Sequence, residues 1–222
     1  MGSKKVFAQG WCFEKIFWIF VICSIFGAFW EEGINLIRHL IRYGQFFWSP
    51  RRGVLYGPFS PIYGMGAVVM VYLLKKGNDK WYTIFFKGAL IGGIFEYLIS
   101  FLQEMFVGTS SWNYSNQLFN IGGRTAPIYI LSWGFLAVVL MKWFYPAITK
   151  MIEGFSYDFA DKITKVLLVF LIFDCLISWS SILRWTLRTH DNAPITPVVR
   201  FYDNVFNDSY MKKHFPNMKV VK

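Results

Sequence analysis

Long runs of apolar residues dominate this sequence, and they limit what the chain can fold into. A soluble domain carries short apolar stretches at helix or strand spacing, whereas several runs in these 222 residues reach or approach the ~20 residues that a helix needs to cross a bilayer. Inside lipid, every backbone polar group must be satisfied within the spanning segments, which favours helices. We therefore predict an all-α polytopic membrane protein.

Five segments meet this description, although unequally. We place the transmembrane helices at about residues 15–38, 58–75, 81–106, 125–145 and 164–187. In the second segment only Pro61–Leu74 is continuously apolar, so the Gly- and Pro-rich stretch 53–61 before it should form a broken or re-entrant segment. The fourth should end before Pro146, and 148–165 is predicted to be an interfacial amphipathic helix. Residues 188–222 should form a short extramembrane tail.

Composition and charge agree with a membrane location. Phe, Tyr and Trp make up 21% of the chain, which is typical of aromatic belts at membrane interfaces. The net charge of +10 comes from basic residues spread between the apolar runs, which indicates contact with lipid headgroups and not with nucleic acid. Their distribution weakly favours a cytoplasmic N-terminus. Cys12, Cys23 and Cys175 show no metal-ligand spacing, so we expect no disulfide framework.

The first half of the sequence partly repeats itself. Residues of the first segment recur 65 positions later in the third: Lys15, Ile19, Phe20, Gly27 and Glu31 as Lys80, Ile84, Phe85, Gly92 and Glu96. The tripeptide that opens the second segment, Pro61–Tyr63, recurs as Pro127–Tyr129. This pattern predicts two parallel helical-hairpin repeats plus a fifth helix. Apolar sequences match themselves readily, so five unrelated helices explain it equally well.

Ionisable side chains inside the apolar segments are the main candidates for a functional site, because such groups are costly in lipid. Hairpin topology gathers them in one half of the membrane, and Glu96 and Glu104 share a helix face, as do Asp174 and Ser178. With polar and aromatic neighbours, the candidate substrate-binding residues are Glu31, Glu32, Arg51, Arg52, Tyr56, Tyr63, Glu96, Glu104, Trp112, Asn120, Arg124, Asp174 and Arg184.

A purely structural role explains many of the same residues. The acids would then pair with the arginines and only fix helix packing. The nearly uncharged loop 107–124 is likewise either an interface plug or a substrate lid. No phosphate-binding loop, zinc-protease motif or nucleophile elbow occurs in the sequence, so we expect no ATP hydrolysis by this chain alone, and we assign no catalytic residue, metal or cofactor.

Several longer strings of residues point to a family. They are Gly10–Glu14, the R-G-x-L-Y-G-P-x-x-P-I-Y-G string at Arg52–Gly64, Trp112–Ser115, Asn120–Arg124 and His214–Met218. Across nearly the whole chain they resemble the bacterial CmpB-like family of ABC-transporter permeases. The resemblance implies a transport subunit in a bacterial plasma membrane, but it assigns no role to any matching residue. A cytoplasmic coupling motif of the ordinary permease kind is not evident.

Three functions fit these observations. The leading hypothesis is a permease-like transport subunit that binds a polar or anionic-headed substrate at a buried Glu/Arg cluster, driven by a separate ATPase subunit or an ion gradient. A homo-oligomer is compatible with this hypothesis. The second is an intramembrane enzyme or lipid-handling protein that uses the same carboxylates as acid, base or metal ligands. The third is a structural or regulatory membrane subunit.

Overall fold

A computed structural model describes residues 6–49, 52–77, 79–190 and 196–221 of the protein. Within these residues, four helices are long and apolar enough to cross a membrane: α1 (Phe13–Tyr43), α3 (Trp81–Val107), the continuous helix Pro127–Glu153 and α6 (Tyr157–Thr189). A shorter apolar helix, α2 (Pro61–Leu74), has 14 residues. The predicted all-α membrane architecture with a short second helix is confirmed.

The long helix Pro127–Glu153 has three successive parts, and the other elements of the chain are short. The three parts are α4 (Pro127–Val139), the π-helix η1 (Leu140–Phe144) and α5 (Tyr145–Glu153). The C-terminal segment forms α7 (Pro197–Val205), α8 (Asp208–His214) and strand β2 (Lys219–Val220). Strand β2 pairs antiparallel with β1 (Thr109–Ser110), which directly follows α3.

Local sequence explains where the apolar helices begin and end. Pro61 and Pro127 open α2 and α4, where a missing backbone N–H costs nothing and the fixed φ suits a helix. Gly44 and Gly108 end α1 and α3 in the left-handed conformation, with φ of 67° and 69°. The Pro-Ile-Tyr repeat therefore marks the start of the second helix in each hairpin.

The sequence predicted that the helix beginning at Pro127 ends before Pro146. This prediction is wrong. The helix widens into the π-helix Leu140–Phe144 and continues as α5 to Glu153. Proline inside an α-helix removes one hydrogen bond and clashes with the preceding turn, and a wider turn is a common way to accommodate such a disruption. The predicted amphipathic helix at 148–165 is therefore divided between α5 and the start of α6.

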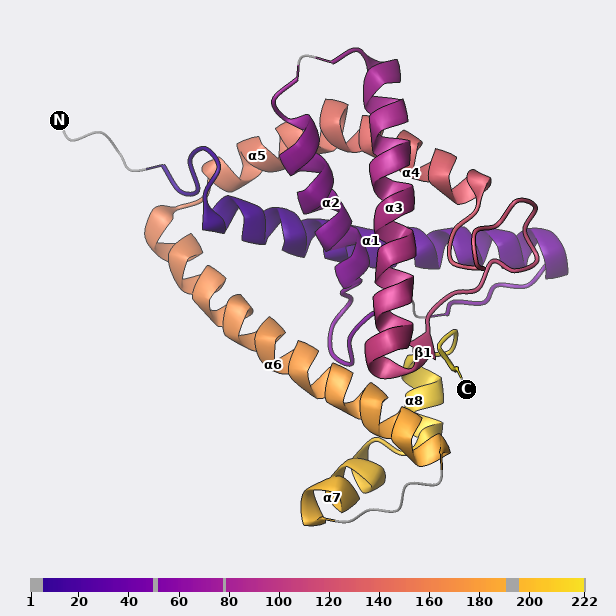
Figure 1. Cartoon of the computed structure of the whole chain (residues 1–222). Helices are drawn as coiled ribbons and strands as arrows, with labels where there is room; N and C mark the ends of the chain where they lie inside the picture. The colour runs from indigo at the N-terminus through magenta and orange to yellow at the C-terminus, as the bar shows by residue number, and fades with distance from the viewer. Residues whose placement is uncertain (1–5, 50–51, 78, 191–195, 222) are drawn as a thin grey trace.

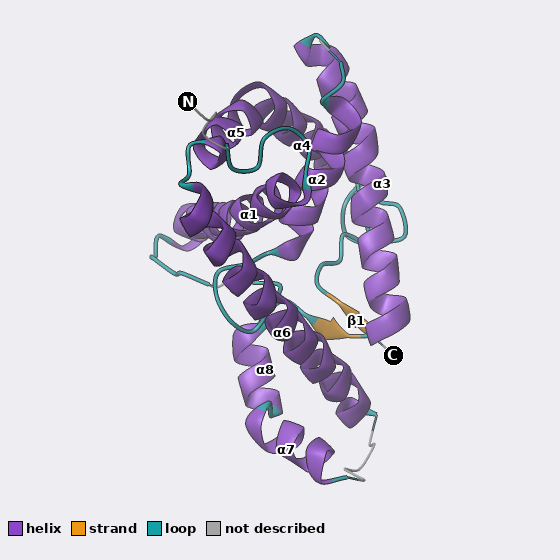
Figure 2. Cartoon of the chain, turned by 90° about the vertical axis from the view of Figure 1, so that its left-hand side faces the viewer, coloured by secondary structure: helices purple, strands orange, loops and turns teal. Residues whose placement is uncertain are grey.

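The helices pack as two pairs, α1 with α2 and α3 with α4. Helix α1 lies lengthwise across Figure 1 and is seen nearly end-on in Figure 2, whereas α3 is upright in both views. The first helices of the two pairs therefore run crosswise to each other. Helix α6 runs diagonally and contacts both α1 and α3. Two helical hairpins plus a further long helix are present, as predicted; the axis relating the hairpins stays a prediction.

Glycines of the repeat allow close packing within each pair. A Cβ atom added at Gly27 would lie 2.2 Å from the Cγ atom of Tyr63, and one added at Gly92 would lie 2.3 Å from the Cβ atom of Trp133. Both distances are far below ordinary van der Waals contact. Each hairpin therefore seats a large aromatic side chain of its second helix directly on the backbone of its first.

The stretch before α2 is non-helical, as predicted, and α6 satisfies part of its backbone. The N–H of Leu55 donates to Oγ of Ser178 at 2.8 Å, and the N–H of Tyr56 donates to Oδ1 of Asp174 at 3.1 Å. Asp174 is only 2% exposed. Since unpaired backbone groups are costly in an apolar surrounding, these two side chains stabilise the irregular stretch.

The C-terminal segment docks on the ends of α3 and α6. Arg184 and Arg188 of α6 both pair with Asp203, at 2.7 Å, and the Val221 N–H donates to the carbonyl of Gly108. The hydrogen bond from Arg184, with the charge of Arg188, lowers the pKa of the Asp203 carboxyl to about 2. These contacts bring the tail underneath the helical hairpins (Figure 1).

Candidate functional site

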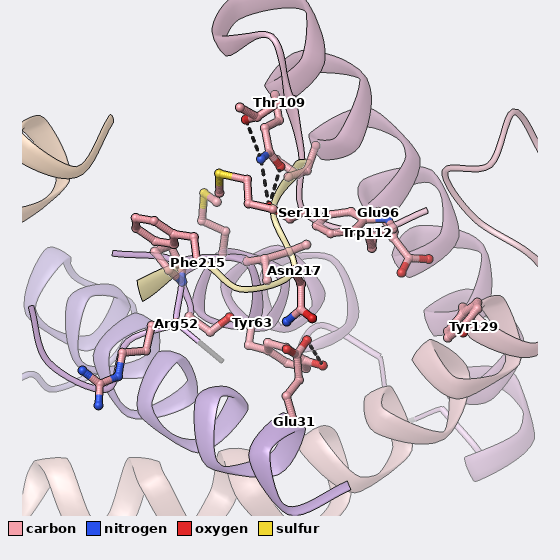
Figure 3. A pocket seen from close by; sticks show the side chains of 18 of the residues that line it. Glu31, Arg52, Tyr63, Glu96, Thr109, Ser111, Trp112, Tyr129, Phe215 and Asn217 are labelled. Atoms are coloured by element: carbon pink, nitrogen blue, oxygen red, sulfur yellow. Dashed lines mark hydrogen bonds between the residues drawn. The ribbon is translucent and has the colours of Figure 1, made fainter. Parts of the chain in front are cut away.

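A cavity of about 710 Å³ lies between the two hairpins, α6 and the C-terminal tail. Each of these parts contributes lining residues, and Figure 3 shows the labelled side chains from α1, α2, α3, α4 and the tail around the space. Its lining includes Trp30, Glu31, Arg38, Arg52, Tyr63, Glu96, Trp112, Tyr114, Tyr129, Trp133, Trp179, Phe215 and Asn217. Residues distant in sequence therefore meet at one site.

Glu96 is the most deeply placed charged residue of this lining. It lies in the middle of α3 and is 6% exposed. Its carboxylate accepts a hydrogen bond from the Thr125 hydroxyl at 2.8 Å and one from the Tyr114 hydroxyl at 3.1 Å. The ring of Tyr114 stacks on that of Tyr129, with centroids 3.7 Å apart. The loop before α4 thus folds back onto α3 and satisfies the buried carboxylate with neutral donors.

Glu31 occupies the equivalent position in the first hairpin and reaches the same cavity. The Tyr63 hydroxyl donates to Oε1 of Glu31 at 3.0 Å (Figure 3). Glu31 and Glu96 line the same cavity. Each carboxylate therefore receives a hydrogen bond from a tyrosine hydroxyl, and the two acids of the sequence repeat face one space.

Burial and the neighbouring Glu96 carboxylate raise the pKa of the loop residue Tyr114 above its ordinary value. Tyr114 therefore stays protonated and acts as a hydrogen-bond donor to Glu96. Its loop is braced by Trp112, whose indole N–H donates to the carbonyl of Arg124 at 2.9 Å. Trp112 lines the cavity as well. This loop thus forms part of the site wall.

The structure brings five of the predicted site residues together around the cavity: Glu31, Arg52, Tyr63, Glu96 and Trp112. Arg52 is exposed, whereas Glu96 is buried. Arg51 lies outside the described residues. Glu32 is buried on α1 but is not part of the lining.

The other predicted candidates have partners away from this lining. Glu104 and Arg124 form an ion pair at 2.5 Å, and Arg184 pairs with Asp203. Asp174 accepts from the N–H of Tyr56, so both belong to the contact between the irregular stretch and α6. Asn120 bonds within its own loop, where it accepts from the N–H of Gly123 at 2.9 Å. The expected Glu/Arg cluster is thus separated into a cavity and several structural pairs.

Sequence reasoning missed several residues of the site. Tyr129 is the repeat equivalent of Tyr63, and Tyr114 and Asn217 lie in strings that carried the family resemblance, so a signal for these three existed. Nothing in the sequence singled out Thr125 or Trp133. Among the described residues, no group of three or more His, Cys, Asp and Glu side chains is placed to hold a metal ion.

Comparison with known protein families identifies a match. A family model for CmpB-like transporters, described as "Putative ABC-transporter type IV", matches residues 18–179. The matched region covers α1 to α6 up to Trp179, and so includes both cavity carboxylates. No curated protein and no solved structure matches the chain.

Proposed function

We propose that this chain, which belongs to the CmpB-like family of type IV ABC transporters, is a transmembrane transport subunit whose solute binds in the cavity between its two helical hairpins. One observation carries this proposal. Glu31 and Glu96, which occupy equivalent positions of the sequence repeat, both line the same cavity. In transporters built from repeated segments, substrate sites typically lie at the repeat interface.

The size and lining of the cavity support a solute site. Ligand pockets have volumes of about 300–1,000 Å³, and this cavity has about 710 Å³. Its wall combines aromatic rings with a few polar groups, which is typical of small-molecule sites. Carboxylates within apolar segments are costly and are functional-site candidates for that reason, and Glu96 is buried in the middle of a long apolar helix.

Energy must come from elsewhere, since the sequence contains no phosphate-binding loop. We propose a separate ATPase subunit as the partner, with a second copy of this chain as a further component. The apolar helices support insertion in a bilayer. A bacterial plasma membrane with the N-terminus in the cytoplasm is the location we propose, from the family and the distribution of basic residues.

Transport can be tested before the solute has been identified. Inside-out membrane vesicles containing the wild-type chain and its co-expressed partners would be incubated with a cell extract, with and without ATP or an ion gradient, and their contents compared by mass spectrometry. We expect at least one compound to accumulate with the wild type and to fall to background with Glu96→Gln. The matched control is Asp161→Asn, which removes a carboxylate from a surface ion pair of α6.

The result depends on equal amounts of folded protein. Vesicles with the wild type and with Glu96→Gln would therefore be matched by quantitative immunoblotting and by size-exclusion profiles of the solubilised protein. Identical contents in all vesicles, with the two proteins equally abundant and folded, would overturn the proposal. Membrane location and orientation are tested separately by reporter fusions at the two termini.

A further inference from the structure

The charged residues of the cavity differ in how far water reaches them. Among the described residues, Glu31, Arg38, Arg52 and Glu96 are the charged side chains of the lining. Both arginines are exposed, whereas Glu96 is 6% exposed. Water and salt screen exposed charges effectively and buried charges much less. Among the described residues, the buried charged side chain of the lining is therefore a carboxylate.

Neutral groups surround the buried carboxylate. Glu96 receives its hydrogen bonds from the hydroxyls of Thr125 and Tyr114. In the described part of the chain, no Lys, Arg or His nitrogen lies within 4.0 Å of its oxygens. Arg124, which is near in sequence, is instead paired with Glu104. These hydroxyls donate hydrogen bonds to Glu96 but carry no positive charge.

A second carboxylate, that of Glu31, lines the same cavity as Glu96. Its Oε1 atom accepts a hydrogen bond from the Tyr63 hydroxyl, which is a neutral donor. Like charges repel and opposite charges attract more strongly in a surrounding of low dielectric constant than in water. A cavity lined by these two acids therefore favours a cationic group over an anionic one.

Aromatic rings form much of the remaining wall. Trp30, Tyr63, Trp112, Tyr114, Tyr129 and Trp133 all line the cavity. The faces of such rings attract ammonium groups, most strongly when the cation is removed from water. They also provide apolar contact for an organic body. Carboxylates and aromatic faces thus favour the same kind of ligand.

We propose that the cavity binds an organic ammonium compound, with its cationic group beside Glu96 and Glu31 and its apolar body against the aromatic wall. This inference rests on the proposed function and specifies the chemical class of the solute. A bare inorganic cation would use the carboxylates but would leave most of a cavity of about 710 Å³, whose lining is mainly apolar and includes aromatic rings, without a role.

Two probes with the same ring and opposite head charges test the inference: benzyltrimethylammonium and phenylmethanesulfonate. Purified protein in nanodiscs of phosphatidylcholine would be titrated with each, and binding followed by intrinsic tryptophan fluorescence and by the thermal unfolding temperature. We expect the ammonium probe to bind at least tenfold more tightly than the sulfonate. Glu96→Gln should weaken ammonium binding at least tenfold, and Asp161→Asn should leave it unchanged.

The comparison of the two probes on the wild-type protein needs no variant, so it tests the preference for ammonium even if Glu96→Gln does not fold. Glu31→Gln serves as a second variant for the effect of removing a carboxylate from the cavity. Equal binding of both probes, preference for the sulfonate, or no binding of either would overturn the inference. The transport proposal fails separately. A Glu96-dependent vesicle solute without a cationic group would contradict the ligand class alone, whereas ammonium binding without any vesicle accumulation would contradict transport alone.

Discussion

Replacing Gly27 by alanine is expected to destabilise the protein, although alanine is the better helix former. Inside a helix, alanine is favoured over glycine by about 0.5–1 kcal/mol. The new methyl group at position 27, however, would lie 2.2 Å from Cγ and 2.3 Å from Cβ of Tyr63. These atoms are at the base of the side chain, so rotation of the ring cannot clear them. Either the Tyr63 side chain or the α2 backbone must move.

Overpacking of a well-packed interior typically costs about 1–3 kcal/mol, which exceeds the gain in helix propensity. We therefore expect a net loss of about 1–2 kcal/mol for Gly27→Ala. Moving Tyr63 also weakens its 3.0 Å hydrogen bond to Glu31, so the variant should bind cavity ligands less tightly. Gly92→Ala should behave alike, because its methyl group would lie 2.3 Å from Cβ of Trp133.

The matched control is Gly33→Ala on the same helix, where a Cβ atom meets nothing within 4 Å. It should stabilise the protein by about 0.5–1 kcal/mol. Unfolding in mixed detergent micelles, followed by tryptophan fluorescence at increasing denaturing detergent, gives the comparison. If Gly27→Ala proves as stable as Gly33→Ala, the close contact between α1 and α2 and the reasoning built on it are wrong.

Three further predictions concern ion pairs and the irregular stretch. Lys15 is 1% exposed and pairs with Glu153 at 2.5 Å. Glu153→Gln should therefore lower the free energy of unfolding by about 3–5 kcal/mol, because it leaves the buried ammonium group without its partner. The double variant Lys15→Met/Glu153→Met should recover most of this loss in the same unfolding assay. Because the folded-state pKa of Asp203 is lowered to about 2, its contribution to tail docking is complete above the unfolded-state pKa of ~3.9 and is lost as the pH falls through about 2; Asp203→Asn should expose the tail to protease already at neutral pH. Asp174→Ala should increase hydrogen exchange at the amides of residues 53–60 and leave exchange within α3 unchanged. The reason is that Oδ1 of Asp174 accepts a hydrogen bond from the N–H of Tyr56 in that stretch.

Local patterns in the sequence were sufficient to predict the apolar helices of this fold, but not the short helices and strands of the tail. Apolar length located the long helices, and Pro61 and Pro127 marked the starts of two of the apolar helices. Pro146 is the exception, because proline was expected to end a helix that instead widens into a π-turn and continues. A single sequence does not show whether a helix will stop at a proline or widen around it, since packing against neighbouring elements decides which conformation has the lower free energy.

The site was predictable only in part. Glu31 and Glu96 were found because an acid within an apolar segment is costly wherever the helix lies. Their separation from Arg124 and Asp174 was not predictable, because it depends on helix rotation and on which partner lies nearer. Arg124 lies beside Glu104, and Asp174 meets a backbone N–H, a kind of partner that side-chain patterns do not reveal. Thr125 carried no signal at all.

The tail residues of the cavity wall bear on the order in which the site forms during synthesis. Phe215 and Asn217 line the cavity, yet they are made after all four long helices. The ribosome can thus release those helices into the membrane while the cavity still lacks one wall. A chain cut short after α6 would keep both cavity carboxylates and the two helical hairpins, but it would lack the tail residues of the lining. Insertion of the helices can therefore precede completion of the cavity wall.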